Sequence, residues 1–589
     1  MFDQSGATNG TVWDVSFDFV SVGSGGGGLV AALKAEDEGL DTLVIEKQSL
    51  VGGSTAMSGG MVWMPNNPLM RANGTDDSYQ DALAYFDSVV GDGGPGSSPA
   101  RRHAFVTEGP RIVGFLQRHG VKFVPAPGWA DNYDTYQGGK TEGRSIECPP
   151  FDAGRLGEWE HKIQPGITAG IGFVAGTYEL LSLMNFNRSV PAFVRTARIF
   201  LRTKLARVRK KTLLGGGAAL IGNLLEATLD RDVPIWTDTA VVDLVTEGDR
   251  VVGVRATRAG KDVYIQARKG VLLAAGGFAH NRQMREMYGG DQIPPGEWTI
   301  ANRGDTGEVL AAAMRLGAQT DLMDEAWWLP RTMGGGGIST LDNARCRPRT
   351  IMVDASGQRF VNEANSKVQV GKAMFARDKT ARAIPSWLIT DDRYRRRYNH
   401  THSLRHLGRF PKEWLATGYV KSAPTLEDLA RSCGIDPHGL EATVQRFNAH
   451  ARQGIDPDFH RGESEYNRLN GDPANKPNPT LGPIEDAPFY AIELIPADVG
   501  TCGGLVTDEH AQVLGTDNEP ITGLYATGNT TATIMGRTYM SAGGSISNSI
   551  VFGYLAAAHA AQCTSETDAR HTSSGDSARD SIGDGPRRL

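Results

Sequence analysis

The sequence predicts an α/β fold built on a parallel β-sheet of the Rossmann type, and three observations lead to this expectation. A β-prone run at Val15–Val22 precedes a glycine-rich turn that opens a helical pattern. A second β-prone run follows at Thr42–Lys47, which completes a strand, helix, strand unit. Further along, Val241–Val271 alternates apolar and polar residues around Gly-Asp turn signals, which indicates an antiparallel meander inserted in the same domain.

Length and composition are typical of a folded protein that does not bind nucleic acid. The 589 residues suggest two to four domains at roughly 150 residues each. A net charge of −6 gives no field strong enough to collect polyanions. Glycine contributes 73 residues without a collagen repeat, which indicates many tight turns and close backbone approaches to a ligand. The five cysteines have no metal-binding spacing, so neither a disulfide framework nor a metal site is predicted.

No secretory signal peptide or membrane span is predicted. The first residues contain no basic stretch followed by an apolar core, and no window approaches about 18 uninterrupted apolar residues. We therefore expect a cytoplasmic protein without a transmembrane span. Residues 562–589 contain almost nothing apolar, so they are predicted to form a disordered tail.

The turn after the first strand carries a dinucleotide-binding pattern, G-x-G-x-x-G, at Gly23, Gly25 and Gly28. The first glycine permits a tight turn, the second lets the backbone approach a pyrophosphate, and the third lets the helix pack on the sheet. Glu46 stands 23 residues after Gly23, at the end of the second strand, where a carboxylate can bind ribose hydroxyls. The glycine pattern and Glu46 together predict a dinucleotide-binding site.

Further glycine-rich segments favour FAD over NAD. The loop Gly52–Gly60 has small residues that can run along a pyrophosphate and a flavin without clashes, which NAD folds do not need. Two later apolar strands end at Gly276 and Gly528 and bring bare backbone to a cofactor. No histidine lies between Gly23 and Gly60 to tether the flavin, so FAD is expected to be non-covalent. The residues assigned to the cofactor are Gly23, Ser24, Gly25, Gly28, Glu46, Lys47, Gly53, Ser54, Thr55, Ser58, Gly59, Gly60, Ala275, Gly276, Gly528, Asn529, Ser545 and Ile546.

Motifs from about Asp14 to Ala561 resemble, in order, those of the FAD-dependent 3-ketosteroid dehydrogenases (Δ1 and Δ4-(5α)), within the fumarate reductase flavoprotein superfamily. They include VGSGGGGLVAAL, GGKTEGRSIECPPFDAGRLG, AAGGFAHNRQM, GQRFVNEA and GLYATGNTTATIMGRTY. The resemblance implies an FAD-binding domain of the glutathione reductase 2 type over residues 14–300 and 496–561. It implies an α+β substrate cap over residues 301–495 that closes on the flavin.

The same resemblance implies an oxidoreductase acting on CH–CH groups in steroid or lipid degradation. Such an enzyme introduces a double bond next to the carbonyl of a 3-ketosteroid or similar cyclic ketone: a base removes the α-proton, flavin N5 accepts a hydride, and an external acceptor reoxidises the flavin. Tyr539 and the backbone N–H of Gly543 resemble the family's pair that holds the keto oxygen. One donor of such an oxyanion hole can contribute about 3 kcal/mol.

The proton-abstracting base is left open between several residues. Lys367 aligns with the family's base tyrosine after GQRFVNEA, and a buried lysine of lowered pKa can act as a base, although a solvated surface lysine fits the position equally well. Ser541 lies in a loop that reads YMSAG where Δ1-dehydrogenases commonly have YPGPG, and it resembles the proton-relaying serine of the Δ4-(5α) branch. Tyr133 matches an assisting tyrosine, with Tyr136 or Asn132 as alternatives.

Two other functions are considered. A fumarate-reductase-like enzyme would reduce an α,β-unsaturated acid or ketone with an external donor, and it would need arginines and histidines converging on two carboxylates, a set that the sequence does not reveal. A flavin carrier without catalysis would leave Tyr539 and Gly543 without a role.

The segment 191–211 is the most basic part of the chain. It carries eight lysines and arginines, no acidic residue, and apolar residues at helical spacing. One interpretation is peripheral contact with anionic lipid, from which an apolar steroid could be collected. The other is a solvated cationic face on a helix that packs against the protein.

Overall fold

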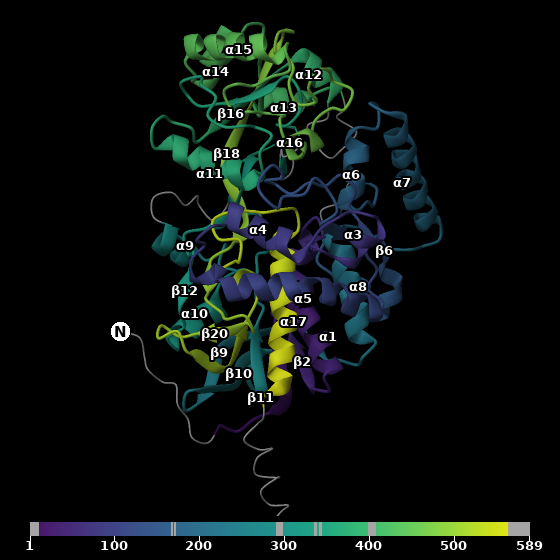
Figure 1. Ribbon diagram of the computed structural model, residues 1–589, viewed down its shortest axis with the longest axis vertical. Helices are drawn as coiled ribbons and strands as arrows, with labels where there is room; N and C mark the ends of the chain where they lie inside the picture. The colour runs from purple at the N-terminus through teal and green to yellow at the C-terminus, as the bar shows by residue number, and fades with distance from the viewer. Residues whose placement is uncertain are drawn as a thin grey trace, which may run out of the picture.

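The computed structural model describes residues 11–166, 169, 172–289, 298–334, 339–340, 344–398 and 408–563. They form a nucleotide-binding body, drawn in the lower half of Figure 1, and a cap in its upper half. Helices α6 (Thr177–Met184) and α7 (Val190–Val208) stand along one side. Apart from its first two residues, the tail expected at 562–589 lies outside the described residues.

The body is built on the parallel sheet that the sequence predicts. Strand β1 (Val15–Val22) pairs in parallel with β2 (Thr42–Ile45) and with β11 (Lys261–Leu273). The sheet order is β20-β21-β11-β1-β2-β8, with β8 at Ile235–Trp236, β20 at Gln512–Leu514 and β21 at Pro520–Ala526. Because β21 comes from the far end of the chain, both terminal thirds of the chain contribute to one sheet.

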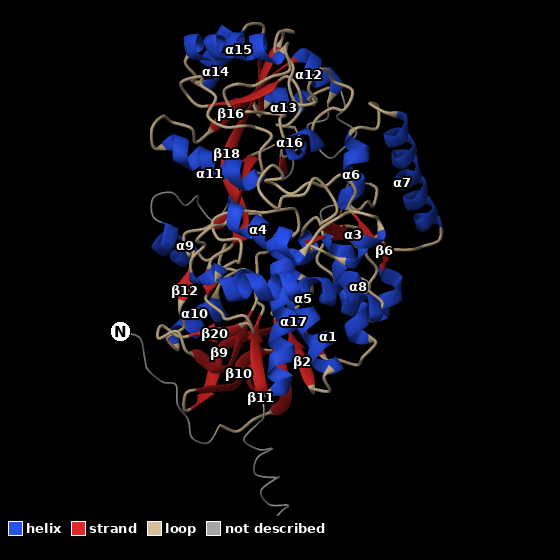
Figure 2. Cartoon of the chain, viewed as in Figure 1, coloured by secondary structure: helices blue, strands red, loops and turns tan. Residues whose placement is uncertain are grey.

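The predicted meander is confirmed. Strands β9 (Thr239–Glu247) and β10 (Arg250–Arg258) pair antiparallel with each other, and β10 pairs antiparallel with β11. Strand β11 is long enough to belong to both arrangements, since its second half continues as a central strand of the parallel sheet. The meander therefore extends the sheet downward in Figure 2, away from the cap.

Helices cover both faces of the body sheet. On one face, α1 (Gly26–Asp37) packs against α17 (Gly544–Gln562), and a Cβ on Gly553 would lie only 2.3 Å from the carbonyl oxygen of Gly27, so the two helices touch backbone to backbone. On the other, α10 (Glu308–Arg315) buries Val309 and Leu310 in the core beneath the meander. The structure thus places α10 in the body, although the sequence assigned 301–495 to the cap.

The cap is an antiparallel sheet with helices, as expected for an α+β unit. Its strand order is β14-β13-β18-β16-β15, and β17 also pairs with β18. The strands are β13 (Ala326–Thr332), β14 (Ser339–Thr340), β15 (Thr350–Val353), β16 (Ser386–Asp391), β17 (Val420–Ala423) and β18 (Phe489–Thr501). The helices are α11 (Lys367–Asp378), α12 (Asp392–Arg397), α13 (Lys412–Ala416), α14 (Leu426–Cys433), α15 (Pro437–Ala451) and α16 (Glu465–Leu469).

Two kinds of segment join body and cap. Strand β18 runs from the middle of the cap sheet to the body, and it pairs along its second half with β13. Between β2 and β8 the chain forms a flank of helices and small sheets. It comprises α2 (Gly53–Met57), β3 (Met61–Trp63), α3 (Pro68–Ala72), α4 (Tyr79–Val89), α5 (Pro99–Arg118), β4 (Val124–Pro125), β5 (Ser145–Glu147), β6 (Phe151–Asp152), α6, α7, β7 (Leu213–Leu214) and α8 (Gly217–Leu229).

Candidate active site

A cavity of about 970 Å³ is lined by residues of the body, the cap and helix α6. Its body half is rich in glycine and small polar residues, and its cap half is mainly apolar. Of the eighteen residues that the sequence assigns to FAD, all but Gly28 line this cavity. The remaining assignment, Gly28, serves packing, because a Cβ there would lie 2.0 Å from the carbonyl oxygen of Gly23.

The glycine-rich turn leaves room for a phosphate group. Gly23 has φ +112° and a Cβ on it would lie 2.3 Å from the carbonyl oxygen of Ala274, so only glycine fits there. At Gly25 a Cβ would approach nothing in the protein closer than the Thr55 hydroxyl, at 3.7 Å. Gly25 is the residue that precedes α1, and a helix N-terminus attracts anions. The space beside Gly25 therefore suits a pyrophosphate.

The polar residues around this turn are fixed by their own hydrogen bonds. Glu46 is buried, and its carboxylate accepts hydrogen bonds from the Ser24 hydroxyl at 2.6 Å and from the backbone N–H of Gln48 at 2.9 Å. Lys47 donates to the Thr306 hydroxyl at 2.6 Å and forms an ion pair with Glu308. The carboxylate that the sequence assigns to a ribose is therefore held in place at the cavity wall.

Asp305 is a cavity residue that the sequence reasoning missed. Its carboxylate is buried and accepts a hydrogen bond from the Ser54 hydroxyl at 3.1 Å. Burial raises the pKa of Asp305 to about 7. The available signal is the turn between Gly304 and Gly307, because glycines directly before a helical pattern are also what identified the first turn. The cradle, the helix N-terminus and these carboxylates together fit a dinucleotide such as FAD.

The predicted keto-oxygen pair lines the cavity. Tyr539 and Gly543 both line it, and the Tyr539 ring contacts the Trp327 ring edge to face at 5.2 Å. Gly543 has φ +97°, and a Cβ on it would lie 2.5 Å from the carbonyl oxygen of Met61. The Gly543 N–H donates to no other residue in the described part of the chain. Because Gly543 caps the start of α17, this N–H has the helix dipole behind it, which favours negative charge.

Hydrogen bonds from the flank hold the loop between Tyr539 and Gly543. Asn132 donates from its side-chain amide to the Tyr539 carbonyl at 2.6 Å and from its backbone N–H to the Met540 carbonyl at 2.9 Å. The Tyr85 hydroxyl donates to the Met540 carbonyl at 2.7 Å, and the Ser145 hydroxyl donates to the Ala542 carbonyl at 3.0 Å. These bonds constrain a loop, residues 539–543, that contains no proline.

The candidates for the base are placed differently. Lys367 lines the cavity, and its Nζ lies 5.7 Å from the centre of the Tyr539 ring. Ser541, which belongs to the loop between Tyr539 and Gly543, is buried and does not line the cavity. Tyr133 packs against the half-exposed Tyr136 and does not line the cavity either. Burial, with a smaller contribution from Tyr136, raises the pKa of Tyr133 to about 12. The structure thus brings Lys367, Asn132 and Tyr133 to Tyr539, because the Tyr133 side chain hydrogen-bonds the Tyr539 backbone. Neither Ser541 nor Tyr133 lines the cavity.

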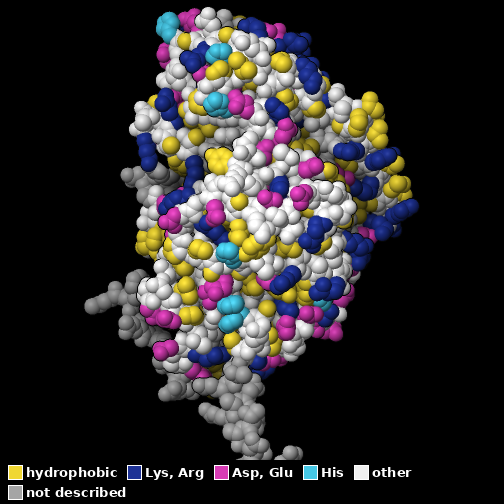
Figure 3. Space-filling model, viewed as in Figure 1, with side chains coloured by type: hydrophobic (Ala, Val, Ile, Leu, Met, Phe, Trp, Pro, Cys, Tyr) yellow, Lys and Arg dark blue, Asp and Glu magenta, His cyan; other side chains and the backbone are white. Residues whose placement is uncertain are grey.

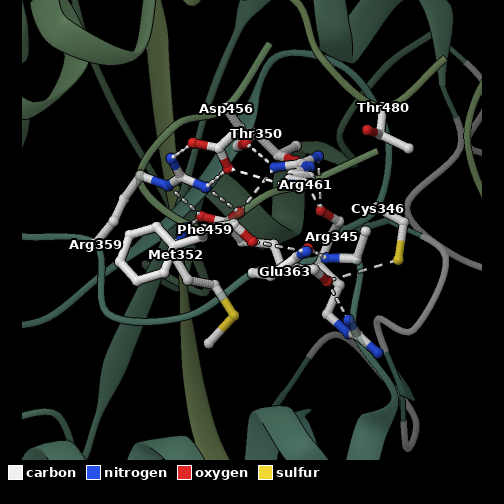
Figure 4. A network of polar contacts seen from close by, with 12 residues as sticks. Arg345, Cys346, Thr350, Met352, Arg359, Glu363, Asp456, Phe459, Arg461 and Thr480 are labelled. Carbon is white, nitrogen blue, oxygen red and sulfur yellow. Dashed lines mark hydrogen bonds and ion pairs between the residues drawn. The ribbon is translucent and has the colours of Figure 1, made fainter. Parts of the chain in front are cut away.

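A buried ionic network fixes the segment that leads to Lys367 (Figure 4). Arg359 pairs with both Glu363 and Asp456 at 2.8 Å, and Arg461 donates to Glu363 at 3.1 Å. Burial opposes ionisation of Glu363, but the guanidinium groups of Arg359 and Arg461 hold its pKa below the usual value. Arg345 donates to the Asn365 carbonyl at 2.8 Å just before α11 begins. The GQRFVNEA motif therefore has a structural role, which is to place α11.

The cap half of the cavity is suited to an apolar ligand. Its walls include Leu329 and Trp414 of the cap, together with Trp129, Leu180 and Met184 of the flank. Its cations are Arg345 and Lys367, and no histidine is present among the described lining residues.

Comparisons with known proteins show the family and the fold of this chain. A family model described as "FAD binding domain" matches residues 18–546. The 3-oxosteroid 1-dehydrogenase of Mycolicibacterium smegmatis is 40% identical over 553 residues, which cover 92% of this chain and 96% of that protein. The crystal structure of 3-ketosteroid Δ1-dehydrogenase from Sterolibacterium denitrificans in complex with 1,4-androstadiene-3,17-dione superposes with a TM-score of 0.87 at 34% identity, covering 93% of this chain and 99% of the other. The 3-ketosteroid Δ4-(5α)-dehydrogenase of Rhodococcus jostii shares the fold, with a TM-score of 0.67 at 24% identity over 95% of this chain and 99% of the other.

Proposed function

This chain belongs to the FAD-dependent 3-ketosteroid dehydrogenase family, and on that premise we propose that it desaturates a 3-ketosteroid next to its carbonyl. The enzyme is an oxidoreductase that acts on CH–CH groups and uses FAD. The 40% identity to a 3-oxosteroid 1-dehydrogenase supports desaturation between carbons 1 and 2 of the steroid. The substrate, the ring position and the external electron acceptor are parts of the proposal.

The observation that carries the proposal is that Tyr539, Gly543 and Lys367 all line the cavity, with Lys367 beside Tyr539. Tyr539 and the Gly543 N–H would donate to the ketone oxygen, and their hydrogen bonds would strengthen as enolate charge develops. Bound FAD supplies the acceptor for the hydride that leaves the neighbouring carbon. The apolar walls exclude water, which makes each of these electrostatic contributions larger than in solution.

We assign the removal of the α-proton to Lys367. Its amine would accept the proton, and its Nζ lies 5.7 Å from the centre of the Tyr539 ring, beside the proposed donor to the ketone oxygen. Ser541 and Tyr133 are the alternatives, and each would need a relay, because neither lines the cavity.

A fumarate-reductase-like reaction is less well supported. Two substrate carboxylates would need a convergent set of cations. In the apolar half of the cavity, the described lining residues offer Arg345 and Lys367 and no histidine.

The test is anaerobic mixing of the yellow protein with a panel of ketones, followed by the flavin absorbance. We expect 3-ketosteroids to bleach the flavin with a higher kcat/KM than simple cyclohexanones, and we expect NMR of the product to show the double bond between carbons 1 and 2. Bleaching by dithionite but by no ketone would refute the proposed activity. A 4-ene product would refute the assigned ring position alone.

None of the helices in the described part of the chain combines the length and apolar character that crossing a bilayer requires. We propose that contact with a membrane is peripheral and uses the segment 191–211.

A further inference from the structure

Helix α7 turns its large apolar side chains outward. The face that packs on the protein is made of small or polar residues and one isoleucine, at the spacing i, i+4, i+7: Ala192, Thr196, Ile199, Thr203 and Ala206. The opposite face carries Val190, Val194, Leu201, Leu205 and Val208, which are exposed by 77%, 40%, 58%, 44% and 75%. Phe193 and Phe200 flank this stripe, with exposures of 58% and 40%. A surface helix of a soluble protein normally shows the reverse pattern, so this stripe needs a partner.

Basic residues border the apolar stripe on both sides. At about 100° of rotation per residue, Arg195, Arg198 and the C-cap residue Arg209 fall along one edge, and Lys204 and Arg207 fall along the other. The helix contains no acidic residue. Among the described residues, no ion pair is formed by Arg195, Arg198 or Arg209. Figure 3 shows hydrophobic and basic side chains interleaved along the edge of the molecule that α7 forms in Figure 1.

Helix α6 lies between this surface and the cavity. It packs on α7 through the buried cluster Phe173, Leu180, Leu183 and Ile199, and Arg202 of α7 pairs with its Glu179 at 2.7 Å. The same helix lines the cavity with Thr177, Leu180, Leu181 and Met184. Because the stripe is on the outer face of α7, both α7 and α6, about 20 Å together, separate it from the cavity.

From these three observations we propose that α7 docks the protein on an anionic phospholipid surface, and that α6 and α7 form the side through which an apolar ketone passes from the bilayer to the cavity. An apolar stripe with basic borders is the arrangement by which a helix lies in a membrane interface: the stripe enters the acyl boundary and the cations meet phosphate groups. The second half of the proposal rests on the proposed function. A second copy of the chain is a poor occupant, because two such helices would bring their cations together.

The docking test is flotation of the FAD-loaded protein with lipid vesicles. We expect binding to vesicles with about 30% phosphatidylglycerol, little binding to phosphatidylcholine alone, and release by about 0.5 M NaCl. The charge variant is Arg195→Gln, Arg198→Gln and Arg209→Gln, and its control removes three exposed lysines elsewhere: Lys261→Gln, Lys379→Gln and Lys412→Gln. The apolar variant is Val194→Ser, Leu201→Ser and Val208→Ser.

Each cation should contribute roughly five-fold to the vesicle-binding affinity. The charge variant, which lacks three cations, should therefore bind about 100-fold more weakly, whereas the control should bind as the unmodified protein does. The apolar variant should also fail to float, and all variants should keep their FAD and their turnover of a detergent-dispersed ketone. Equal flotation of all proteins, or flotation with neutral vesicles, would overturn docking by α7. A dimer that dissociates on changing the stripe, without flotation, would assign the stripe to a second copy and overturn it as well.

Delivery is tested by comparing turnover of a steroid held in anionic vesicles with turnover of the same steroid in detergent. We expect the turnover rate of the charge variant to be at least ten-fold lower than that of the unmodified protein with vesicles, and to be unchanged in detergent. Equal rates in both would overturn delivery through α6 and α7. Flotation needs no turnover, so an absence of ketone turnover would defeat the proposed function and leave the docking result intact.

Discussion

The side-chain amide of Asn132 donates a 2.6 Å hydrogen bond to the backbone carbonyl of Tyr539, so a residue of the flank sets the position of a residue of the C-terminal segment. Asn132→Ala should keep its FAD but reduce the flavin with ketone roughly 10- to 100-fold more slowly, because a small misplacement of an oxyanion donor is costly. Stopped-flow absorbance measures the rate. Asn132→Asp, which cannot donate this hydrogen bond, should be equally slow, and a normal rate in both variants would remove Asn132 from the positioning of Tyr539.

Tyr539 itself should matter more. Tyr539→Phe preserves the ring contact with Trp327 and deletes one donor to the ketone oxygen. The rate of flavin bleaching should fall about 100-fold or more while FAD remains bound. Near-normal turnover would mean that the tyrosine only packs in the cavity wall.

Lys367 and Ser541 give opposite expectations. If Lys367 takes the α-proton, Lys367→Met should lower flavin reduction about 100-fold or more, and Ser541→Ala should change it by less than about three-fold. The reverse pattern of damage would assign the step to a relay through Ser541, and full activity of both variants would return it to Tyr133 or Tyr136.

Gly25 and Gly28 offer a matched pair of glycines on the same turn. Gly25→Ala meets no protein atom closer than 3.7 Å, so the protein should fold, but its FAD content should fall about ten-fold because the methyl group fills the phosphate's space. Gly28→Ala would place a Cβ 2.0 Å from the Gly23 carbonyl oxygen, so it should yield little soluble protein. The ratio of flavin to protein absorbance, with circular dichroism, separates the two effects. Full FAD content in Gly25→Ala would contradict the assignment.

Glu147 should make stability depend on pH. Its buried carboxylate accepts the backbone N–H groups of Thr177 and Tyr178 at the start of α6, and burial raises its pKa to about 8 from an ordinary 4.5. A raised acid pKa contributes stability that is present below about pH 4.5 and lost as the pH rises through about 8. Relative to Glu147→Gln, the unmodified protein should therefore lose on the order of 5 kcal/mol between these limits. Denaturant titrations at several pH values measure the difference, and parallel curves for the two proteins would contradict it.

The nucleotide half of the site was predictable because its signals are local. Gly23, Gly25 and Gly28 follow one strand directly, and backbone geometry alone dictates glycine at such a turn. Asp305 was missed because its contact with Ser54 joins residues 251 positions apart, and no spacing rule covers that distance. The cap boundary at 301 was set before α10 for a similar reason: the periodicity of a helix shows that it has a buried face but not which sheet covers it.

The catalytic half was predictable only in part. Tyr539 and Gly543 lie four residues apart in one loop, so sequence order brings them together. Lys367, Tyr133 and Asn132 come from other elements, and their relation to Tyr539 depends on how the flank and the cap pack. The helical spacing of the apolar residues along 191–211 likewise predicted an amphipathic helix, but it did not show that the apolar side of this helix faces outward.

The strand β18 limits how the cap can move. Along 495–501 it is hydrogen-bonded to β13. At the body end of β18, the Asp498 carboxylate accepts hydrogen bonds from the buried Arg285 at 2.8 Å and from the Thr299 hydroxyl at 2.5 Å. Two paired strands form a stiff ribbon, whereas a single loop acts as a swivel. The two paired strands therefore allow the cap to twist by small amounts relative to the body, but they resist a large hinge motion of the cap away from it. Exchange of large ligands must then occur at the edge where no paired strands cross from body to cap.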